Sequence, residues 1–109
     1  MGFMKWLMKK GAIGGAARLM IKAYRKEKKR NPNASDKEIF ESIAKWRYSI
    51  TGEHLSHGKL DEMIQSSSLR DFVHKIVTAE RSKDMIRASD RAIHDVIDVI
   101  NEVCDEEGI

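Results

Sequence analysis

Apolar residues recur at every third or fourth position along most of the chain, which is the spacing of one face of an α-helix. The clearest stretch begins at Ser35, which forms a capping-box pattern with Glu38 and so marks a helix start. Four apolar residues then follow at steps of four, three and four: Ile39, Ile43, Trp46 and Ile50. This pattern predicts a helix with one buried face.

Similar stripes predict helices in most of the remaining chain. The expected ranges are 3–10, 16–30, 59–65 and 82–105, with a further helix whose start is marked by Ser68 and Asp71. The apolar positions of the last helix cover a wide face, so we expect that helix at the centre of the protein. No alternating strand pattern competes with these helices. The predicted fold class is therefore all-α, a small irregular bundle of four to five helices.

Glycine and proline residues divide this pattern. Pro32 disfavours helical geometry in the residue before it and should end the preceding helix. Gly11 and the Gly14–Gly15 pair are expected to weaken or break the first helix. We therefore expect residues 1–14 to form a basic amphipathic N-terminal segment with some flexibility. Residues 15–109 are expected to form a single helical domain.

The composition sets the class of protein and its compartment. A chain of 109 residues is long enough for one domain with one core. Cys104 is the single cysteine, so no disulfide can form within the chain, and this favours a reducing compartment such as the cytoplasm. The longest uncharged run near the N-terminus covers residues 11–17, well short of the roughly 20 residues that cross a bilayer. We expect a cytoplasmic protein without a transmembrane span, or one that lies peripherally at the inner membrane surface.

The charge is divided unequally between the two ends of the chain. Residues 1–30 contain ten Lys or Arg residues and one acid, Glu27, whereas residues 31–109 contain ten Lys or Arg residues and sixteen acids. The first segment therefore carries +9 and the second −6, which the overall charge of +3 conceals. A strongly basic segment favours anionic partners. These could be an acidic protein surface, a membrane or nucleic acid. The acidic last helix, of this chain or of a second copy, is one such protein surface.

The first candidate site is the N-terminal segment. Phe3, Trp6 and Leu7 are apolar residues among lysines, a composition that suits a contact with a protein partner or with a second copy of the chain. The same composition is found in helices that lie on anionic membrane surfaces. The simplest alternative is that Phe3, Leu7 and Met8 cover the core of their own domain or of a second copy.

The second candidate site is a row of cations on the predicted helix at residues 16–30. Arg18, Lys22, Arg25 and Lys29 follow one another at steps of four, three and four, so they share one side of that helix. Such a row could bind an acidic partner or phosphates, or could simply be solvated. Tyr24 is the nearest aromatic residue and lies on the apolar stripe, so specific nucleic-acid binding is the weaker alternative.

The remaining candidates are histidines and the cysteine. His54 and His57 have the spacing of a metal-binding pair, but no second pair of ligands supports a metal site. Cys104 is expected to be a buried thiol on the apolar face of the last helix. The segment Gly11–Gly15 lacks the lysine of a phosphate-binding loop, and no catalytic motif is present. We therefore expect no cofactor, no metal and no enzymatic activity.

These observations predict a non-enzymatic helical interaction or adaptor module. Its basic, apolar-studded N-terminal region would contact an acidic protein partner or a second copy of the chain. The partner-binding residues would be Phe3, Trp6 and Leu7 as apolar anchors, with the cation row as the electrostatic component. The alternative is a peripheral protein that binds an anionic membrane surface or, less specifically, nucleic acid.

Overall fold

The computed structural model describes residues 3–51, 56–81 and 88–109. Within these ranges the chain forms helices and no strand. The helices are α1 (Phe3–Lys10), α2 (Ala12–Arg30), α3 (Asp36–Thr51), α4 (His57–Ile64), α5 (Leu69–Glu80) and α7 (Asp90–Glu106). The predicted all-α class, a small helical bundle, is confirmed.

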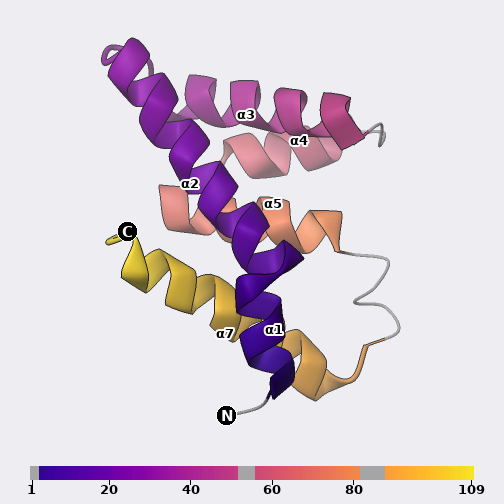
Figure 1. Cartoon of the computed structure of the whole chain (residues 1–109). Coiled ribbons are helices and arrows are strands. Elements are labelled where there is room, and N and C mark those ends of the chain that lie inside the picture. The colour runs from indigo at the N-terminus through magenta and orange to yellow at the C-terminus, as the bar shows by residue number, and fades with distance from the viewer. Residues whose placement is uncertain (1–2, 52–55, 82–87) are drawn as a thin grey trace.

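The long helix α2 connects the two ends of the bundle (Figure 1). It packs against α3, α5 and α7, while α3 and α4 lie together at one end. At the other end lies α1, which directly precedes α2 in the chain. It packs against α7, the last helix of the chain. The N-terminal and C-terminal parts of the chain are therefore neighbours in space.

Serine side chains cap the N-termini of four of these helices. The predicted cap at Ser35 is present, because its Oγ accepts a hydrogen bond from the backbone N–H of Glu38 at 3.2 Å. Ser68 caps α5 in the same way. Two further caps had not been predicted: Ser56 begins α4 two residues earlier than expected, and Ser89 begins α7. The start predicted for the last helix, at residue 82, lies outside the described residues.

The C-terminus of α7 closes in a Schellman motif. Gly108 has a φ of 76°, which places it in the left-handed region that favours glycine. The N–H of Ile109 donates to the carbonyl oxygen of Cys104 at 3.0 Å, and the N–H of Gly108 donates to that of Asp105 at 3.2 Å. The Ile109 side chain packs partly against the core, so the end of α7 is fixed in position.

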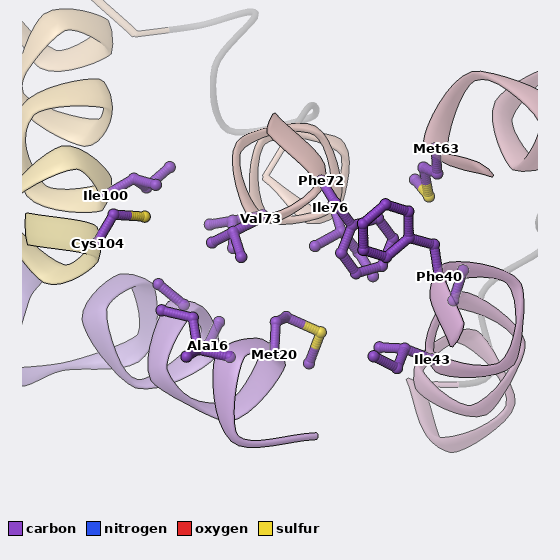
Figure 2. Packing of buried hydrophobic residues seen from close by; sticks show 14 of the residues in the cluster. Ala16, Met20, Phe40, Ile43, Met63, Phe72, Val73, Ile76, Ile100 and Cys104 are labelled. Carbon is purple, nitrogen blue, oxygen red and sulfur yellow. The ribbon is translucent and has the colours of Figure 1, made fainter. Parts of the chain in front are cut away.

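Two stacked phenylalanines lie at the centre of the core (Figure 2). The ring centroids of Phe40 on α3 and Phe72 on α5 are 4.4 Å apart and the rings are nearly parallel. Met20 from α2 approaches the same region, and Cys104 extends the core toward α7. Cys104 is fully buried, as predicted, and burial raises the pKa of its thiol.

The apolar face of α3 differs from the prediction. Ile39 and Ile43 are buried as expected, but Trp46 is 42% exposed and Ile50 is 60% exposed. The buried face instead continues through Tyr48, eight residues after Phe40 and therefore on the same side of the helix. The last turns of α3 thus present a tryptophan and an isoleucine to solvent.

The glycines near the N-terminus have a different role from the predicted one. Helix α2 begins at Ala12, so the Gly14–Gly15 pair lies inside it and the break falls at Gly11. Gly14 is buried against the end of α1, where an added Cβ would lie 1.9 Å from the carbonyl oxygen of Lys9. Gly14 therefore permits the close approach of α1 to α2. The domain boundary expected after residue 14 falls within α2.

Candidate interaction surfaces

The lysines of α1 face a row of acids on α7. The Nζ of Lys5 lies 3.2 Å from a carboxylate oxygen of Asp98, and the Nζ of Lys9 lies 3.7 Å from one of Glu102. Lys9 also forms an ion pair with Glu106. The three acids are four residues apart, so successive turns of α7 present them on one side. These ion pairs hold α1 along α7.

Two arginines of α2 extend this contact. The Nη1 of Arg18 donates a hydrogen bond to the carbonyl oxygen of Lys9 at 2.9 Å, which satisfies one of the free carbonyls at the end of α1. The Nη2 of Arg18 lies 4.0 Å from a carboxylate oxygen of Glu106. Two turns later, Arg25 donates hydrogen bonds to the side chain and the backbone carbonyl of Glu107. Much of the basic charge is therefore matched within the chain.

The contact between Lys9 and Glu106 shifts the pKa of both groups. The hydrogen bond between the side chains raises the pKa of Lys9 and lowers the pKa of Glu106. The negative charge of Glu102 also raises the pKa of Lys9. The positive charges of Arg18 and Lys10 also lower the pKa of Glu106. Both groups therefore keep their charges over a wider pH range than isolated side chains would.

The acidic helix is itself held in place by α5. The Nη1 of Arg70 donates hydrogen bonds to a carboxylate oxygen of Asp105 at 2.8 Å and to the backbone carbonyl of Ile109 at 2.9 Å. The Nη2 of Arg70 contacts the side-chain oxygen of Asn101, which also lies 2.8 Å from Nε2 of His74. These bonds place a cation at the C-terminus of α7, where the helix dipole favours positive charge.

The outer side of α1 is apolar. We call Phe3, Met4, Trp6 and Leu7 the α1 face, because all four side chains are exposed on this short helix. Phe3 is 71% exposed and Trp6 is 54% exposed, and their rings stack with centroids 6.1 Å apart. No described residue of α1 is buried. Of the residues expected to cover the core in the alternative interpretation, Met8 packs against it, whereas Phe3 and Leu7 are exposed.

An apolar groove continues from the α1 face onto α7. It has a volume of about 340 Å³ and is lined by Met4 and Leu7 on one side and by Ile93 and Val96 of α7 on the other, with Arg81 also in its lining. Two residues of the α1 face thus also line the groove. The face and the groove form one continuous apolar surface.

The cations predicted as one row have different neighbours in the structure. Arg18 and Arg25 contact α7, as described above. Lys22 instead lines a second groove, between α2 and α3, together with Lys26 and Trp46. Lys29 is exposed and forms no ion pair or hydrogen bond with the residues that the structure describes. Two members of the row are therefore matched by α7, while Lys22 and Lys29 are exposed.

Of the two histidines considered for a metal site, the structure describes only one. His54 lies outside the described residues, and His57 is exposed at the first position of α4. In the described ranges, no three His, Cys, Asp or Glu side chains gather closely enough to hold a metal ion. None of the helices described has both the length and the apolar character that a membrane span needs.

Comparisons with known proteins give no relative for this chain. No protein-family model matches it, and no curated protein and no solved structure shows significant similarity to it. The inferences below therefore depend on the surfaces of this molecule alone.

The groove between α2 and α3 was not predicted from the sequence. The apolar pattern predicts Trp46 on the buried side of its helix, whereas the structure places it in this groove with Leu19. One signal was present, because Leu19 is an apolar residue that lies outside the buried stripe of Ala17, Met20 and Ile21. Leu19 becomes informative only together with Trp46, because the structure brings both exposed apolar side chains into the same groove.

Proposed function

We propose that this chain is a non-enzymatic interaction module that associates with a second copy of itself through the α1 face. The observation that carries this proposal is the exposure of four neighbouring large apolar side chains on α1, a helix anchored to α7 by Lys5 and Lys9. Clustered exposed apolar side chains are typical of contact surfaces, whereas isolated ones need no explanation.

A second copy suits this face because two of the three lysines on α1 are already matched, and the third, Lys10, is exposed at the end of the helix. Lys5 and Lys9 are paired with acids of α7, so two α1 faces can approach each other without strong repulsion between these lysines. In a twofold contact the same patch meets itself, which an apolar patch tolerates and a strongly charged one does not. The stacked rings of Phe3 and Trp6 would supply the largest part of the buried area.

The proposal is tested by measuring molar mass over a range of protein concentrations by sedimentation equilibrium. The wild-type chain is expected to form a dimer as its concentration rises. The double variant Phe3→Ser/Trp6→Ser should weaken this association by about tenfold or more, because each removed ring deletes apolar contact area. Ile50→Ser is the matched control, since it also removes an exposed apolar side chain but lies on α3.

Two results would contradict the proposal. One is a wild-type chain that stays monomeric up to millimolar concentration, and the other is an equal loss of association in the Ile50→Ser control. Co-sedimentation with anionic vesicles separates the membrane alternative. Binding of the monomer to such vesicles, lost in Phe3→Ser/Trp6→Ser, would assign the α1 face to a membrane surface instead.

A further inference from the structure

A second contact surface lies between α2 and α3, away from the α1 face. We call it the α2–α3 groove. It has a volume of about 410 Å³, and its lining combines apolar and charged side chains. The apolar members are Leu19, Ala23, Ile43 and Trp46, and the charged members are Lys22, Lys26, Glu27 and Arg30.

The dimensions of the groove suit a helix. The residues of α2 that line it extend from Leu19 to Arg30, a distance of about 16 Å along the helix axis and close to three helical turns. Ile43 is buried, and Trp46 is partly exposed beside it. A docked amphipathic helix could place apolar side chains against Leu19 and Trp46, as in other complexes where a helix binds a groove.

The charge of the groove selects an acidic occupant. Lys22 and Lys26 form no ion pair or hydrogen bond with any residue that the structure describes, whereas Arg30 pairs with Glu27 at 3.0 Å. Two unmatched lysines beside an apolar lining favour a partner with carboxylates flanking its apolar residues. A basic partner would be repelled.

The acidic helix of this chain is a poor candidate for that occupant. In α7 the acids Asp98, Glu102 and Glu106 already contact the lysines of α1, and Asp105 contacts Arg70. Docking α7 of a second copy in the groove would require these contacts to break. The unmatched lysines therefore indicate a different protein.

We propose that the α2–α3 groove binds an acidic amphipathic helix of a partner protein. Its apolar side chains would contact Leu19 and Trp46, and its carboxylates would pair with Lys22 and Lys26. A helix reaches Ile43 in the concave lining, which a flat bilayer does not. This site is separate from the α1 face, so either proposal can fail without the other.

The test uses three synthetic helical peptides that share the same apolar positions. Residues flanking those positions are Glu in the first peptide, Gln in the second and Lys in the third. Binding is followed by the fluorescence of Trp46 in a Trp6→Phe background. The Glu peptide is expected to bind saturably and at least about tenfold more tightly than the Lys peptide, with an affinity that falls as salt rises.

Charge reversal then locates the contact. Lys22→Glu/Lys26→Glu should weaken binding of the Glu peptide by about tenfold or more. Lys37→Glu/Lys59→Glu makes the same change in net charge at exposed lysines outside the groove and should leave the affinity nearly unchanged. Thermal melting of each variant verifies that the fold is retained. A third variant, Leu19→Gln, tests the apolar lining without a change of charge and should also weaken binding.

Several results would overturn the proposal. One is the absence of saturable peptide binding, and another is equal affinity for the Glu and Lys peptides. A third is a loss of affinity for the Glu peptide in the control variant that equals the loss in Lys22→Glu/Lys26→Glu. Tighter binding of anionic vesicles or of a single-stranded oligonucleotide, lost in Lys22→Glu/Lys26→Glu, would assign the groove to those partners. The variant Phe3→Ser/Trp6→Ser should bind the Glu peptide normally, which separates this test from that of the α1 face.

Discussion

The backbone of Gly14 packs so closely against the carbonyl of Lys9 that even a methyl group would not fit between them. An added Cβ would lie 1.9 Å from that oxygen, far inside the van der Waals distance. The obstacle is main chain, which cannot rotate aside as a side chain can. The orientation of α1 relative to α2 therefore depends on the absence of a side chain at position 14.

Gly14→Ala is expected to destabilise the protein by about 1–3 kcal/mol, because the added methyl group must displace α1. Gly15→Ala is the matched control. A Cβ at Gly15 would meet no atom within 4 Å, so this change should stabilise the helix by about 0.8–1 kcal/mol through its better helix propensity. Urea unfolding measures both effects. If both variants changed the free energy of unfolding by the same amount, α1 would not pack against Gly14 in this way.

The stability of the protein should fall at acidic pH partly through Glu106. Its folded-state pKa lies below the ordinary value of 4.5, because Lys9 donates a hydrogen bond to the ionised carboxylate. A depressed pKa contributes stability that is fully present above pH 4.5 and is lost as the pH falls through the folded pKa. Glu106→Gln should therefore reduce the slope of stability against pH below pH 4.5.

Urea unfolding from neutral pH down to about pH 3 measures this slope. Lys9→Gln should reduce it as well, and the double variant should show little further change, since the two groups act through the same contact. Asp71 also has a lowered pKa, so part of the slope will remain in both variants. An unchanged slope in both single variants would contradict the ion pair between α1 and α7.

Tyr24 should titrate at unusually alkaline pH. Its hydroxyl donates a hydrogen bond of 2.7 Å to Asp36, and this bond, together with burial, raises the pKa of Tyr24 to about 12. A raised pKa contributes stability that is present below the ordinary value of 10.0 and is lost as the pH rises through about 12. Ultraviolet titration of tyrosinate measures the transition. Asp36→Ala should lower this pKa toward 10.0, and Tyr24→Phe should remove the transition near 12.

Replacing a phenylalanine by alanine should change the free energy of unfolding by very different amounts in the core and on α1. Phe72→Ala removes a fully buried ring that stacks on Phe40 and is expected to destabilise the protein by about 3–5 kcal/mol. Phe3→Ala removes a ring that is mostly exposed and should change the free energy of unfolding by no more than about 0.5 kcal/mol. Both variants are compared in dilute solution, where the protein is monomeric. Similar costs would place Phe3 in the core.

Helix starts and the main apolar stripes could be predicted from sequence because they depend on neighbouring residues. Ser35 with Glu38 and Ser68 with Asp71 are local patterns, and the structure contains both caps. The buried face of α3 was harder to predict, because Trp46 and Tyr48 are two residues apart and propensity alone does not decide which one faces inward. That choice depends on which helices pack against α3.

The surfaces could be predicted only in part. The unequal distribution of charge indicated that the basic end of the chain has an acidic partner, and α7 supplies much of it. The sequence does not show which cations α7 contacts, because the paired residues are far apart along the chain. Arg25 and Glu107, for example, are about 80 residues apart. Sequence spacing places Arg18 and Lys22 on one side of a helix, but the packing of α7 and α3 directs them to different neighbours.

The central claim is that α1 presents its apolar side outward and that a second copy covers it. Trp6 fluorescence in a Trp46→Phe background tests this claim most directly, because Trp6 is then the only tryptophan. In dilute solution Trp6 should show the red-shifted emission and ready quenching of an exposed indole. As the protein concentration rises, the emission should shift to the blue with the same midpoint as the increase in molar mass. A Trp6 that is already buried at the lowest concentration, or that stays exposed at every concentration, would contradict the account.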